Sequence, residues 1–568
     1  MRLSENGKIV LSRYLLKDKE GKTAEKPENL LRRVASDIAK EDSKFGAGKK
    51  QIAETEKEFF EMMNSLDFLP NLPVLANAGR KLQQLAACFV LPVPDDMAGI
   101  FQSIKDMALI QKSGGGTGFS FSRLRPEGFY VSETGGIASG PVSFMKVFDS
   151  ATGAIKEGGI RRGANMGILR VDHPDIEKFI TCKEKGGLSN FNISVAITDE
   201  FMNAVLKEKD FNLKFQGRTF KTVKAAELFK AISKHAWING DPGIIFIDKI
   251  NKFNPTPKLG DIEATNPCGE QPLLSYESCI LGSINLSNFV NPRSKKLDFK
   301  KLEKTIESSV HFLDNSIEAT SYPLPEIEKI VKGNRKIGLG IMGFADSLIK
   351  MQIAYDSEKA EKFAERIMRF IKDSARKASE NLAKTRGSFP NKINSIFKND
   401  KKPLRNATLT TIAPTGTIAI LANASEGIEP LFNIAFSRNS TYGALLEVNS
   451  LFLETAKKLG LSEEAFEKIA RRGTLQNIPE IPEKIKKIFK TAHDISPEWH
   501  IRIQSAFQKY TDNAVSKTVN LPQNATVEDI EKVFLLAYKL GLKGLTIYRY
   551  NSRKEQVLSF CEKCNLKI

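Results

Sequence analysis

Apolar residues recur at two different spacings along this chain, and the two spacings predict different elements. In the first 65 residues, Leu30, Leu31, Val34 and Ile38 follow the three- and four-residue intervals of one helix face, in a background of charged residues. The same spacing predicts further helices over residues 301–321, 357–386 and 446–490. We therefore expect a helical N-terminal region and long helices in the second half of the chain.

Between these helices, short apolar runs bounded by proline and glycine predict strands. Residues 88–93 and 243–247 form such runs, and residues 544–550 form another near the C-terminus. From about residue 66 onward, these runs alternate with glycine loops and helical segments. Strands that alternate with helices over so long a stretch indicate an α/β fold.

Composition excludes several classes of protein. Of the 568 residues, 41% are hydrophobic and 27% are charged, so a disordered, collagen-like or disulfide-scaffold chain is excluded. No window reaches the ~18 consecutive apolar residues that a membrane span needs. The N-terminus also lacks the apolar core of a signal peptide. We therefore expect a cytoplasmic protein that does not bind a membrane.

The charge balance indicates a polyanionic partner. The chain has 85 basic and 67 acidic residues, a net charge of +18, and such an excess favours phosphorylated ligands, nucleic acids or anionic surfaces. The lysines are nevertheless spread along the whole chain, as on solvated helix faces, and no nucleic-acid-binding motif is present. Small phosphorylated molecules are therefore a better expectation than nucleic acid.

The cysteines say more about chemistry than the overall composition does. Six cysteines are too few for a disulfide framework in a chain of this length. None of the five histidines stands at metal-ligand spacing from a cysteine or from another histidine. We therefore expect no zinc site and assign no metal-binding residues. The six cysteines are Cys88, Cys182, Cys268, Cys279, Cys561 and Cys564.

The segment 264–273 is the most unusual in the chain. A proline favours extended backbone on one side of Cys268, and Gly269 frees the backbone on the other. If the segment is extended, the side chains of Asn266, Cys268 and Glu270 lie on one side. An amide, a reactive thiol and a carboxylate that accepts a proton then form a catalytic set. The alternative is a turn with one buried cysteine.

The remaining cysteines divide into two groups. Cys88, Cys182 and Cys279 are each, when taken alone, most simply small core residues, since free cysteine is often buried. Cys561 and Cys564 form a C-x-x-C pair close to the chain end, where a dithiol can move. One such pair supplies only half of a tetrahedral zinc site, so a redox role is favoured.

Three glycine loops suggest contacts with phosphate, because clustered backbone N–H groups without bulky side chains can hold an anion. The third loop precedes a helix-prone run, so its amides could lie at a helix start. A G-x-G-x-x-G sequence at 338–343 would indicate a dinucleotide site, but no apolar strand precedes it and we discount that interpretation. The loops are residues 113–118, 158–163 and 413–418.

Together these segments resemble the catalytic subunit of ribonucleotide reductase, most closely the adenosylcobalamin-dependent class II enzymes. Matching motifs run in the family's order from about residue 66 to residue 558. The most specific is NPCGEQPL at residues 266–273. The others are ACFVLP at 87–92, SGGGTGFSFSRLR at 113–125, APTGTI at 413–418, Glu429-Pro430, SKTVNLP at 516–522 and TIYRY at 546–550.

The resemblance implies a fold and a domain organisation. We expect an α/β fold: a ten-stranded α/β barrel made of two half-barrels, with an inner finger loop that carries the radical cysteine. A helical region over residues 1–65 would precede the barrel at 66–550, and a mobile tail would follow at 551–568. The N-terminal region is shorter than the ATP-binding cone of many relatives and does not match it. We therefore expect no activity control by ATP and dATP.

The resemblance also implies a role for each member of the catalytic set. Cys268 becomes a thiyl radical that removes the 3′-hydrogen of a ribonucleoside diphosphate. Glu270 takes the 3′-hydroxyl proton, and Asn266 holds that hydroxyl by hydrogen bonds. Cys88 and Cys279 deliver two electrons as the 2′-hydroxyl leaves as water, and they end as a disulfide. Adenosylcobalamin is the implied radical source.

The same resemblance implies further ligands and partners. Cys561 and Cys564 reduce the disulfide and are themselves reduced by thioredoxin or a glutaredoxin-like protein. A deoxynucleoside triphosphate effector would bind at the interface of a homodimer. The substrate contacts are Ala87 and Gly116, with the diphosphate on Pro414, Thr415, Gly416, Thr417 and Ile418. The effector contacts are Asp95, Lys112, Arg125, Arg161 and Arg162.

Two alternatives stay open. A class I-type catalytic subunit would receive its radical from a separate metal-bearing protein through C-terminal tyrosines. Here Tyr548 and Tyr550 are separated by Arg549, unlike the adjacent pair typical of class I, and this favours class II. A non-catalytic nucleotide-binding protein would explain the charge and the glycine loops. It would not explain the cysteines together with Asn266 and Glu270.

Overall fold

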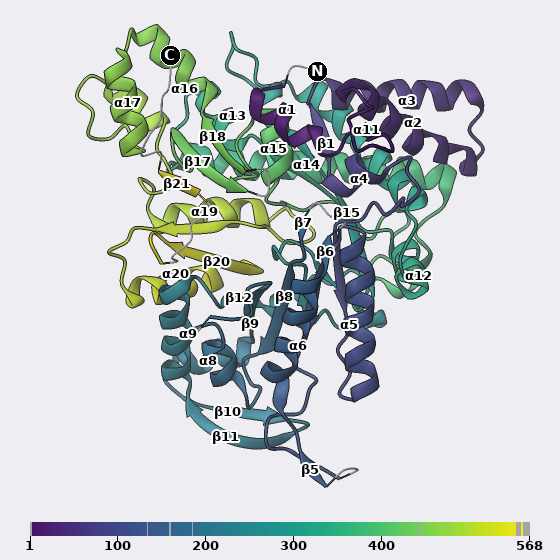
Figure 1. Cartoon of the computed structure of the whole chain (residues 1–568), viewed down its shortest axis with the longest axis vertical. Coiled ribbons are helices and arrows are strands. Elements are labelled where there is room, and N and C mark those ends of the chain that lie inside the picture. The colour runs from purple at the N-terminus through teal and green to yellow at the C-terminus, as the bar shows by residue number, and fades with distance from the viewer. Residues whose placement is uncertain are drawn as a thin grey trace.

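The N-terminal part of the chain is helical. The computed structural model describes residues 3–132, 135–157, 161–184, 186–440, 443–552 and 558–560. The apolar face of α2 (Pro27–Ala39) is buried, and α2 packs against α3 (Lys49–Asn64) and α11 (Phe299–Ala319). Figure 1 shows these helices grouped with α1 (Glu5–Ser12) at one end of the molecule. The expected helical N-terminal region is therefore confirmed.

Five parallel strands form the first half of the central sheet. Each pairs in parallel with its neighbour, and helices cover their outer face (Figure 1). In spatial order the strands are β2 (Cys88–Leu91), β3 (Gly116–Ser120), β8 (Asn165–Arg170), β9 (Phe191–Ile197) and β12 (Gly243–Phe246). The helices between them include α5 (Met97–Lys112), α6 (Gly140–Ala154), α8 (Asp199–Leu206) and α9 (Ala225–Asn239).

Two parallel pairs form the second half of the sheet. β15 (Glu277–Asn285) pairs with β16 (Ile337–Met342), and β19 (Thr518–Leu521) pairs with β20 (Gly544–Arg549). The halves join in antiparallel fashion, β15 to β2 and β20 to β12. A short strand, β1 (Phe68–Pro70), also pairs with β15 and completes a sheet of ten strands.

Residues 408–412 close this sheet into a barrel. Leu339 in β16 bridges Thr410, and Ile412 bridges Val515 just before β19, both in parallel orientation. The backbone N···O distances that join the three segments are 2.8–3.2 Å. Nine of the sheet strands, all except β1, together with this segment make ten strands in a ring. The expected ten-stranded barrel of two half-barrels is therefore confirmed.

The glycine sequence at 338–343 serves packing within this barrel. Residues 338–342 lie within β16 and Gly343 directly follows it, whereas the glycine turn of a dinucleotide-binding site comes after a strand. A Cβ atom at Gly340 would lie only 2.3 Å from the carbonyl oxygen of Thr411. Only glycine therefore lets the closing segment approach β16 so closely.

Successive residues of each barrel strand point alternately inward and outward. The inward side chains form a buried cluster that includes Cys88, Val90, Ile168, Ile245 and Cys279. Their sequence neighbours Phe89, Leu169, Ile244 and Ile280 belong to the larger outer core that the barrel shares with the helices. The barrel interior is thus a separate compartment, and two cysteines belong to its lining.

The long helices predicted over 301–321 and 357–386 are present, and the stretch 446–490 is largely helical, although residues 446–448 lie in a strand and residues 473–482 are not helical. α11 and α14 (Glu358–Arg386) begin and end within two residues of the expected positions and pack against each other. Further helices are α16 (Ser450–Leu459), α17 (Glu463–Arg472), α18 (Glu483–Ile488), α19 (Pro497–Gln508) and α20 (Val527–Lys539). In the described part of the chain, no helix is both long enough and apolar enough to cross a membrane.

A small sheet lies near the C-terminus. β17 (Ala435–Ser440) pairs in antiparallel fashion with β18 (Gly443–Val448) and with β21 (Leu558–Phe560). The residues of β21 directly precede the predicted tail cysteines. Cys561 and Cys564 themselves lie outside the described residues.

Candidate active site

A short hairpin inside the barrel carries the NPCGEQPL motif. It consists of β13 (Ala264–Thr265) and β14 (Pro272–Leu273). At its tip, Asn266 N–H donates to Gln271 O at 3.1 Å, and Gln271 N–H donates to Asn266 Oδ1 at 3.0 Å. Gly269 has φ of 81°, and its N–H donates back to Asn266 O at 3.0 Å. The tip is therefore a turn, which corrects the extended segment expected from the sequence.

The turn gives its three candidate side chains different environments. Asn266 and Glu270 are 1% and 2% exposed, whereas Cys268 at the apex is exposed. The amide and the carboxylate are therefore fixed among barrel residues, and the thiol remains accessible. This also differs from the alternative of a turn with a buried cysteine.

Glycines in β3 make room for the hairpin. A Cβ atom at Gly118 would lie 1.8 Å from Thr265 O, and one at Gly116 would lie 3.0 Å from Pro267 Cγ. Asn192 Nδ2 also donates to Pro267 O at 2.9 Å. These glycines belong to the loop at 113–118, where the sequence suggested a phosphate contact. Their observed role is close packing against the hairpin.

The opposite wall of the barrel holds the hairpin by its backbone. Thr411 Oγ1 and the Ala514 N–H both donate to Glu270 O at 3.0 Å. Thr411 lies in the segment that closes the barrel, so closure and hairpin position depend on the same residues. Sequence reasoning missed Thr411, because a threonine in a threonine-rich loop carries no spacing signal.

Two cysteines on neighbouring strands meet the hairpin. Cys88 in β2 and Cys279 in β15 are direct partners in the antiparallel register. Asn266 Nδ2 lies 3.1 Å from Cys88 Sγ, and Cys88 Sγ lies 3.9 Å from Glu270 Oε1. The structure thus brings together four of the five predicted catalytic residues from three separate segments. The fifth, Cys268, is at the tip of the same hairpin.

The predicted substrate-contact residues flank this group. Gly116 is the register partner of Cys88 in the next strand, and its N–H donates to Ala87 O at 2.9 Å. Gly116 also lies against Pro267 of the hairpin, so both residues are near Cys88.

Burial controls the protonation of the site. It raises the pKa of Glu270 to about 7, against the opposing effect of its hydrogen bonds. It also raises the pKa of Cys88 well above 9.0, and the nearby Glu270 and Cys268 raise it further. The pKa of Cys279 is likewise raised, chiefly by burial. Near neutral pH, the two thiols therefore keep their hydrogens while Glu270 can exchange a proton.

One oxygen of Glu270 is available for a ligand. Glu270 Oε2 is buried and has no hydrogen-bond partner within the described residues. A buried oxygen without a partner is costly, and a ligand hydroxyl would satisfy it. Two buried thiols, an exposed third thiol and a carboxylate of raised pKa can together carry out proton and hydrogen transfer on a bound hydroxyl compound.

Similarity to known proteins extends over nearly the whole chain. A family model described as "Ribonucleotide reductase, barrel domain" matches residues 86–400 and 396–548, and one described as "Ribonucleotide reductase, all-alpha domain" matches residues 1–83. The chain belongs to the ribonucleotide reductase family. The sequence resemblance is therefore confirmed.

Individual ribonucleotide reductases are similar along most of their length. A Thermoplasma acidophilum protein named vitamin B12-dependent ribonucleoside-diphosphate reductase is 48% identical, over 97% of this chain and 79% of that protein. A Mycobacterium tuberculosis (strain ATCC 25618 / H37Rv) protein of the same name is 46% identical, over 97% and 78%. The solved structure of an Actinobacillus ureae class Id ribonucleotide reductase alpha subunit has a TM-score of 0.79, with 25% identity over 97% of both chains.

The candidate phosphate loop of this reductase follows the closing segment directly. Residues 414–418 come two residues after Ile412, and helix α15 (Gly416–Ala422) begins inside the loop. Thr415 has φ of 60°, and its Oγ1 accepts a hydrogen bond from Gly427 N–H at 2.8 Å. The loop is thus joined to the same segment that holds the hairpin.

A buried lysine links two of the remaining family motifs. Lys517 Nζ lies 2.5 Å from Glu429 Oε2 and 3.0 Å from His500 Nδ1. Glu429 Oε1 also accepts a hydrogen bond from Thr518 N–H at 2.7 Å. The Glu429-Pro430 motif and the SKTVNLP motif are therefore parts of one structural unit beside the phosphate loop.

The predicted effector residues divide between the two ends of helix α5. Asp95 precedes the helix and accepts hydrogen bonds from Arg125 N at 3.0 Å and Arg125 Nε at 2.9 Å. Lys112 is its last residue, separated from Asp95 by a 16-residue helix of about 24 Å. Arg161 and Arg162 form strand β7, paired with β6 (Lys156–Glu157), but their side chains and residues 158–160 lie outside the described residues.

Proposed function

We propose that this chain is an adenosylcobalamin-dependent ribonucleoside-diphosphate reductase, which forms 2′-deoxyribonucleoside diphosphates. The observation that carries the proposal is the meeting of Asn266, Glu270 and Cys88, with Cys279 opposite, inside a closed barrel. The names of the relatives that are 46–48% identical support the cofactor and the substrate level. The class Id structure, at 25% identity, gives weaker support to the class I alternative.

In the proposed reaction, Cys268 acts as a thiyl radical and takes the 3′-hydrogen of the ribose. Glu270 accepts the 3′-hydroxyl proton, and its pKa of about 7 suits a group that must also return a proton. Asn266 orients that hydroxyl. Cys88 and Cys279 supply two electrons and two protons, the 2′-hydroxyl leaves as water, and the two sulfurs form a disulfide. Cys268 finally returns the hydrogen to C3′.

The hairpin tip fits an external radical source. When bound, adenosylcobalamin supplies the organic radical that takes the hydrogen atom from a thiol. Cys268 is exposed at the apex of its turn, while Asn266 and Glu270 beside it are buried. The Cys268 thiol is therefore accessible to the radical source, whereas the thiols of Cys88 and Cys279 are enclosed in the barrel. Exclusion of water from such a site limits the side reactions of a radical.

The effector site is proposed to form between two copies of the chain. Asp95 and Lys112 are too far apart to hold one nucleotide within a single copy. A two-fold dimer packed on α5 would set the start of one helix beside the end of the other. Met97 and Phe101 on this helix are 62% and 51% exposed, an apolar surface that such packing would cover. Arg125, Arg161 and Arg162 are proposed to complete the site.

The remaining ligands follow from the same chemistry. The loop at 414–418 is proposed to hold the substrate diphosphate, beside Ala87 and Gly116. Cys561 and Cys564 are proposed to reduce the Cys88–Cys279 disulfide and to be reduced by thioredoxin or a glutaredoxin-like protein. A cytoplasmic location would supply such reductants and keep the thiols reduced.

The decisive experiment is anaerobic formation of deoxycytidine diphosphate by this chain alone, with adenosylcobalamin, dithiothreitol and a deoxynucleoside triphosphate. We expect product without a second protein. Cys268→Ser should bind nucleotides but form no product. If the native chain binds nucleotides and forms no product, a separate radical-generating protein is required and the class I alternative holds.

A further inference from the structure

A buried ion pair beside the reductive cysteines has no role in the mechanism above. Lys336 Nζ lies 2.6 Å from Glu277 Oε2, and the two side chains are 1% and 0% exposed. Glu277 also accepts hydrogen bonds from Asn334 Nδ2 at 2.6 Å and from Leu274 N–H at 2.9 Å. Burying two charges is expensive, and apolar residues of similar size are often no less stable. Stability alone therefore does not explain the pair.

The pair is built around Cys279. Glu277 precedes Cys279 by two residues in β15, so both side chains lie on one face of the strand. Cys279 Sγ lies 3.6 Å from the carbonyl oxygen of Lys336 itself. One member thus shares the strand of Cys279, and the other contacts its sulfur through the backbone.

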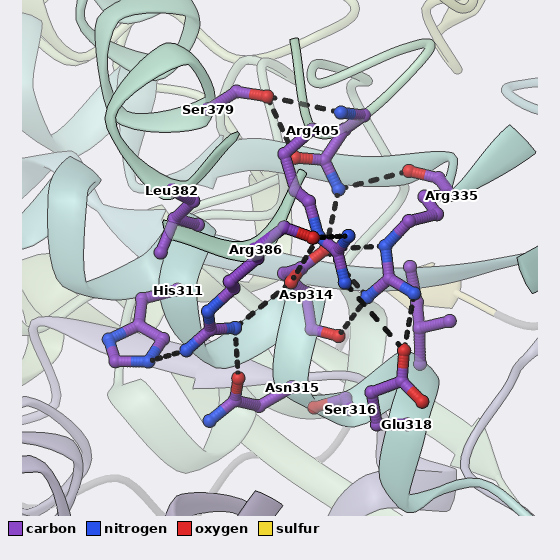
Figure 2. Close-up of polar contacts among 12 residues, drawn as sticks. His311, Asp314, Asn315, Ser316, Glu318, Arg335, Ser379, Leu382, Arg386 and Arg405 are labelled. Atoms are coloured by element: carbon purple, nitrogen blue, oxygen red, sulfur yellow. Dashed lines mark hydrogen bonds and ion pairs between the residues drawn. The ribbon is translucent and has the colours of Figure 1, made fainter. Parts of the chain in front are cut away.

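The residue before Lys336 belongs to a cluster of arginines around Asp314 (Figure 2). The preceding residue, Arg335, has φ of 51°, and its guanidinium binds Asp314 Oδ1 at 2.8–3.0 Å. Asp314 Oδ2 also accepts hydrogen bonds from Arg386 Nη1 at 3.0 Å and from Arg405 Nε at 3.2 Å. Arg335 is therefore anchored by ion pairs directly before Lys336, whose own side chain pairs with Glu277.

The two partner cysteines consequently have different charged neighbours. Burial raises the pKa of Cys88, Glu270 and the other two thiols raise it further, and the Asn266 hydrogen bond lowers it. Burial also raises the pKa of Cys279, but there Lys336 and a hydrogen bond to Ile280 O lower it while Glu277 and Glu270 raise it. A negative charge on sulfur therefore has a cationic neighbour at Cys279 but none among these groups at Cys88. Cys88 is also the less buried of the two, at 5% exposed against 0%.

We infer that Lys336, held by Glu277, is a positioning residue that makes Cys279 the leaving group when the Cys88–Cys279 disulfide is reduced. This inference rests on the proposed function, which forms that disulfide. A thiolate of a dithiol reductant attacks Cys88 Sγ, the S–S bond breaks, and its electron pair goes to Cys279. The second thiol of the reductant then releases Cys88 and becomes part of the reductant's own disulfide. Both freed sulfurs take up protons. The sulfur that better supports negative charge leaves faster.

The direct test maps the first mixed disulfide in a chain that carries Cys561→Ser and Cys564→Ser, so that the tail cannot reduce the Cys88–Cys279 disulfide itself. This enzyme, oxidised by one turnover, is treated with 2-mercaptoethanol, quenched with excess N-ethylmaleimide at neutral pH, and analysed by peptide mass spectrometry. We expect the mercaptoethanol adduct on Cys88 and the maleimide group on Cys279. The reverse pattern, or equal labelling of both cysteines, would overturn the inference without any change at Lys336 or Glu277.

A matched set of variants tests the part played by Lys336. Lys336→Met alone leaves Glu277 buried without its partner, so the double variant K336M/E277Q removes both charges at nearly constant volume. We expect its single-turnover yield from pre-reduced enzyme to be unchanged, while disulfide reduction by dithiothreitol becomes about tenfold slower and the preference for Cys88 is lost. Lys336→Arg should restore both properties.

The outcomes separate this inference from the proposed function. If the folded double variant is reduced at the native rate with the adduct still on Cys88, Lys336 has no such role although the reductase assignment stands. If pre-reduced native enzyme forms no deoxynucleotide in a single turnover with adenosylcobalamin, the proposed function itself fails. Loss of the single-turnover yield only in the double variant would show a role in the chemistry on substrate and would overturn the inference as stated.

Discussion

Replacing Gly118 by alanine tests whether the position of the hairpin sets the rate. The added Cβ would lie 1.8 Å from Thr265 O and 2.8 Å from Thr265 C, both backbone atoms that cannot rotate away. A normal carbon–oxygen contact is about 3.3 Å, so the hairpin must move by about 1.5 Å. Because a misplacement of about 1 Å costs roughly 100-fold in rate, we expect Gly118→Ala to lose at least that factor in kcat.

The assay is anaerobic turnover with adenosylcobalamin and dithiothreitol, with thermal unfolding measured in parallel. Overpacking of this kind costs about 1–3 kcal/mol of stability, which a chain of this size should tolerate. Gly48→Ala is the control, because its Cβ meets no atom nearer than Gln51 Oε1 at 4.0 Å and its φ of −79° suits alanine. A folded Gly118→Ala protein with near-native kcat would refute the claim that hairpin position limits the rate.

Further predictions concern Glu270, Asp314 and Cys182. Burial raises the pKa of Glu270 from 4.5 to about 7, so kcat should rise with pH through about 7. Glu270→Gln should then raise the free energy of unfolding by about 3 kcal/mol above pH 7, because the buried carboxylate is charged there. This gain should disappear below pH 4.5, where the carboxyl group is protonated in both the folded and the unfolded chain. Equal gains in urea denaturation at pH 4 and pH 8 would contradict this. Asp314→Asn, which weakens the pairing of three arginines, should cost about 3–5 kcal/mol in the same measurement, and an unchanged midpoint would speak against the cluster. Cys182→Ser should keep full turnover whereas Cys268→Ser abolishes it; loss in both would indicate a general need for thiols in folding.

Much of the fold could be predicted because its signals are local. The α2 face and the boundaries of α11 and α14 follow from helical spacing. The strand at 88–91 follows from an apolar run bounded by proline. The closing segment at 408–412 could not be predicted in this way. It forms only isolated bridges, and its threonine-rich sequence lacks the strict alternation of apolar and polar residues that indicates a strand.

The candidate site was predicted as a set of residues but not as an arrangement. The alternation of side chains along an extended strand predicted that Asn266 and Glu270 lie on one face. In the structure, the positive φ at Gly269 instead places them around a turn. No sequence spacing relates Cys88 to Cys279. Only the family resemblance predicted that they act as a pair, and in the structure they are direct partners in the antiparallel register of β2 and β15. Lys336 was missed because a lysine next to Arg335 looks like a surface residue, and its burial depends on contacts with Glu277, 59 residues earlier in the chain.

The closure of the barrel by residues 408–412 also constrains how the chain can fold. Leu339, Thr410, Ile412 and Val515 must meet across long intervening segments, and such non-local contacts form slowly. Until the residues of β19 and β20 have been synthesised, β12 and the 408–412 segment expose unpaired strand edges, which favour aggregation. Chains truncated before residue 513 should therefore accumulate as insoluble material, because the nascent protein depends on residues 513–549 to cover these strand edges.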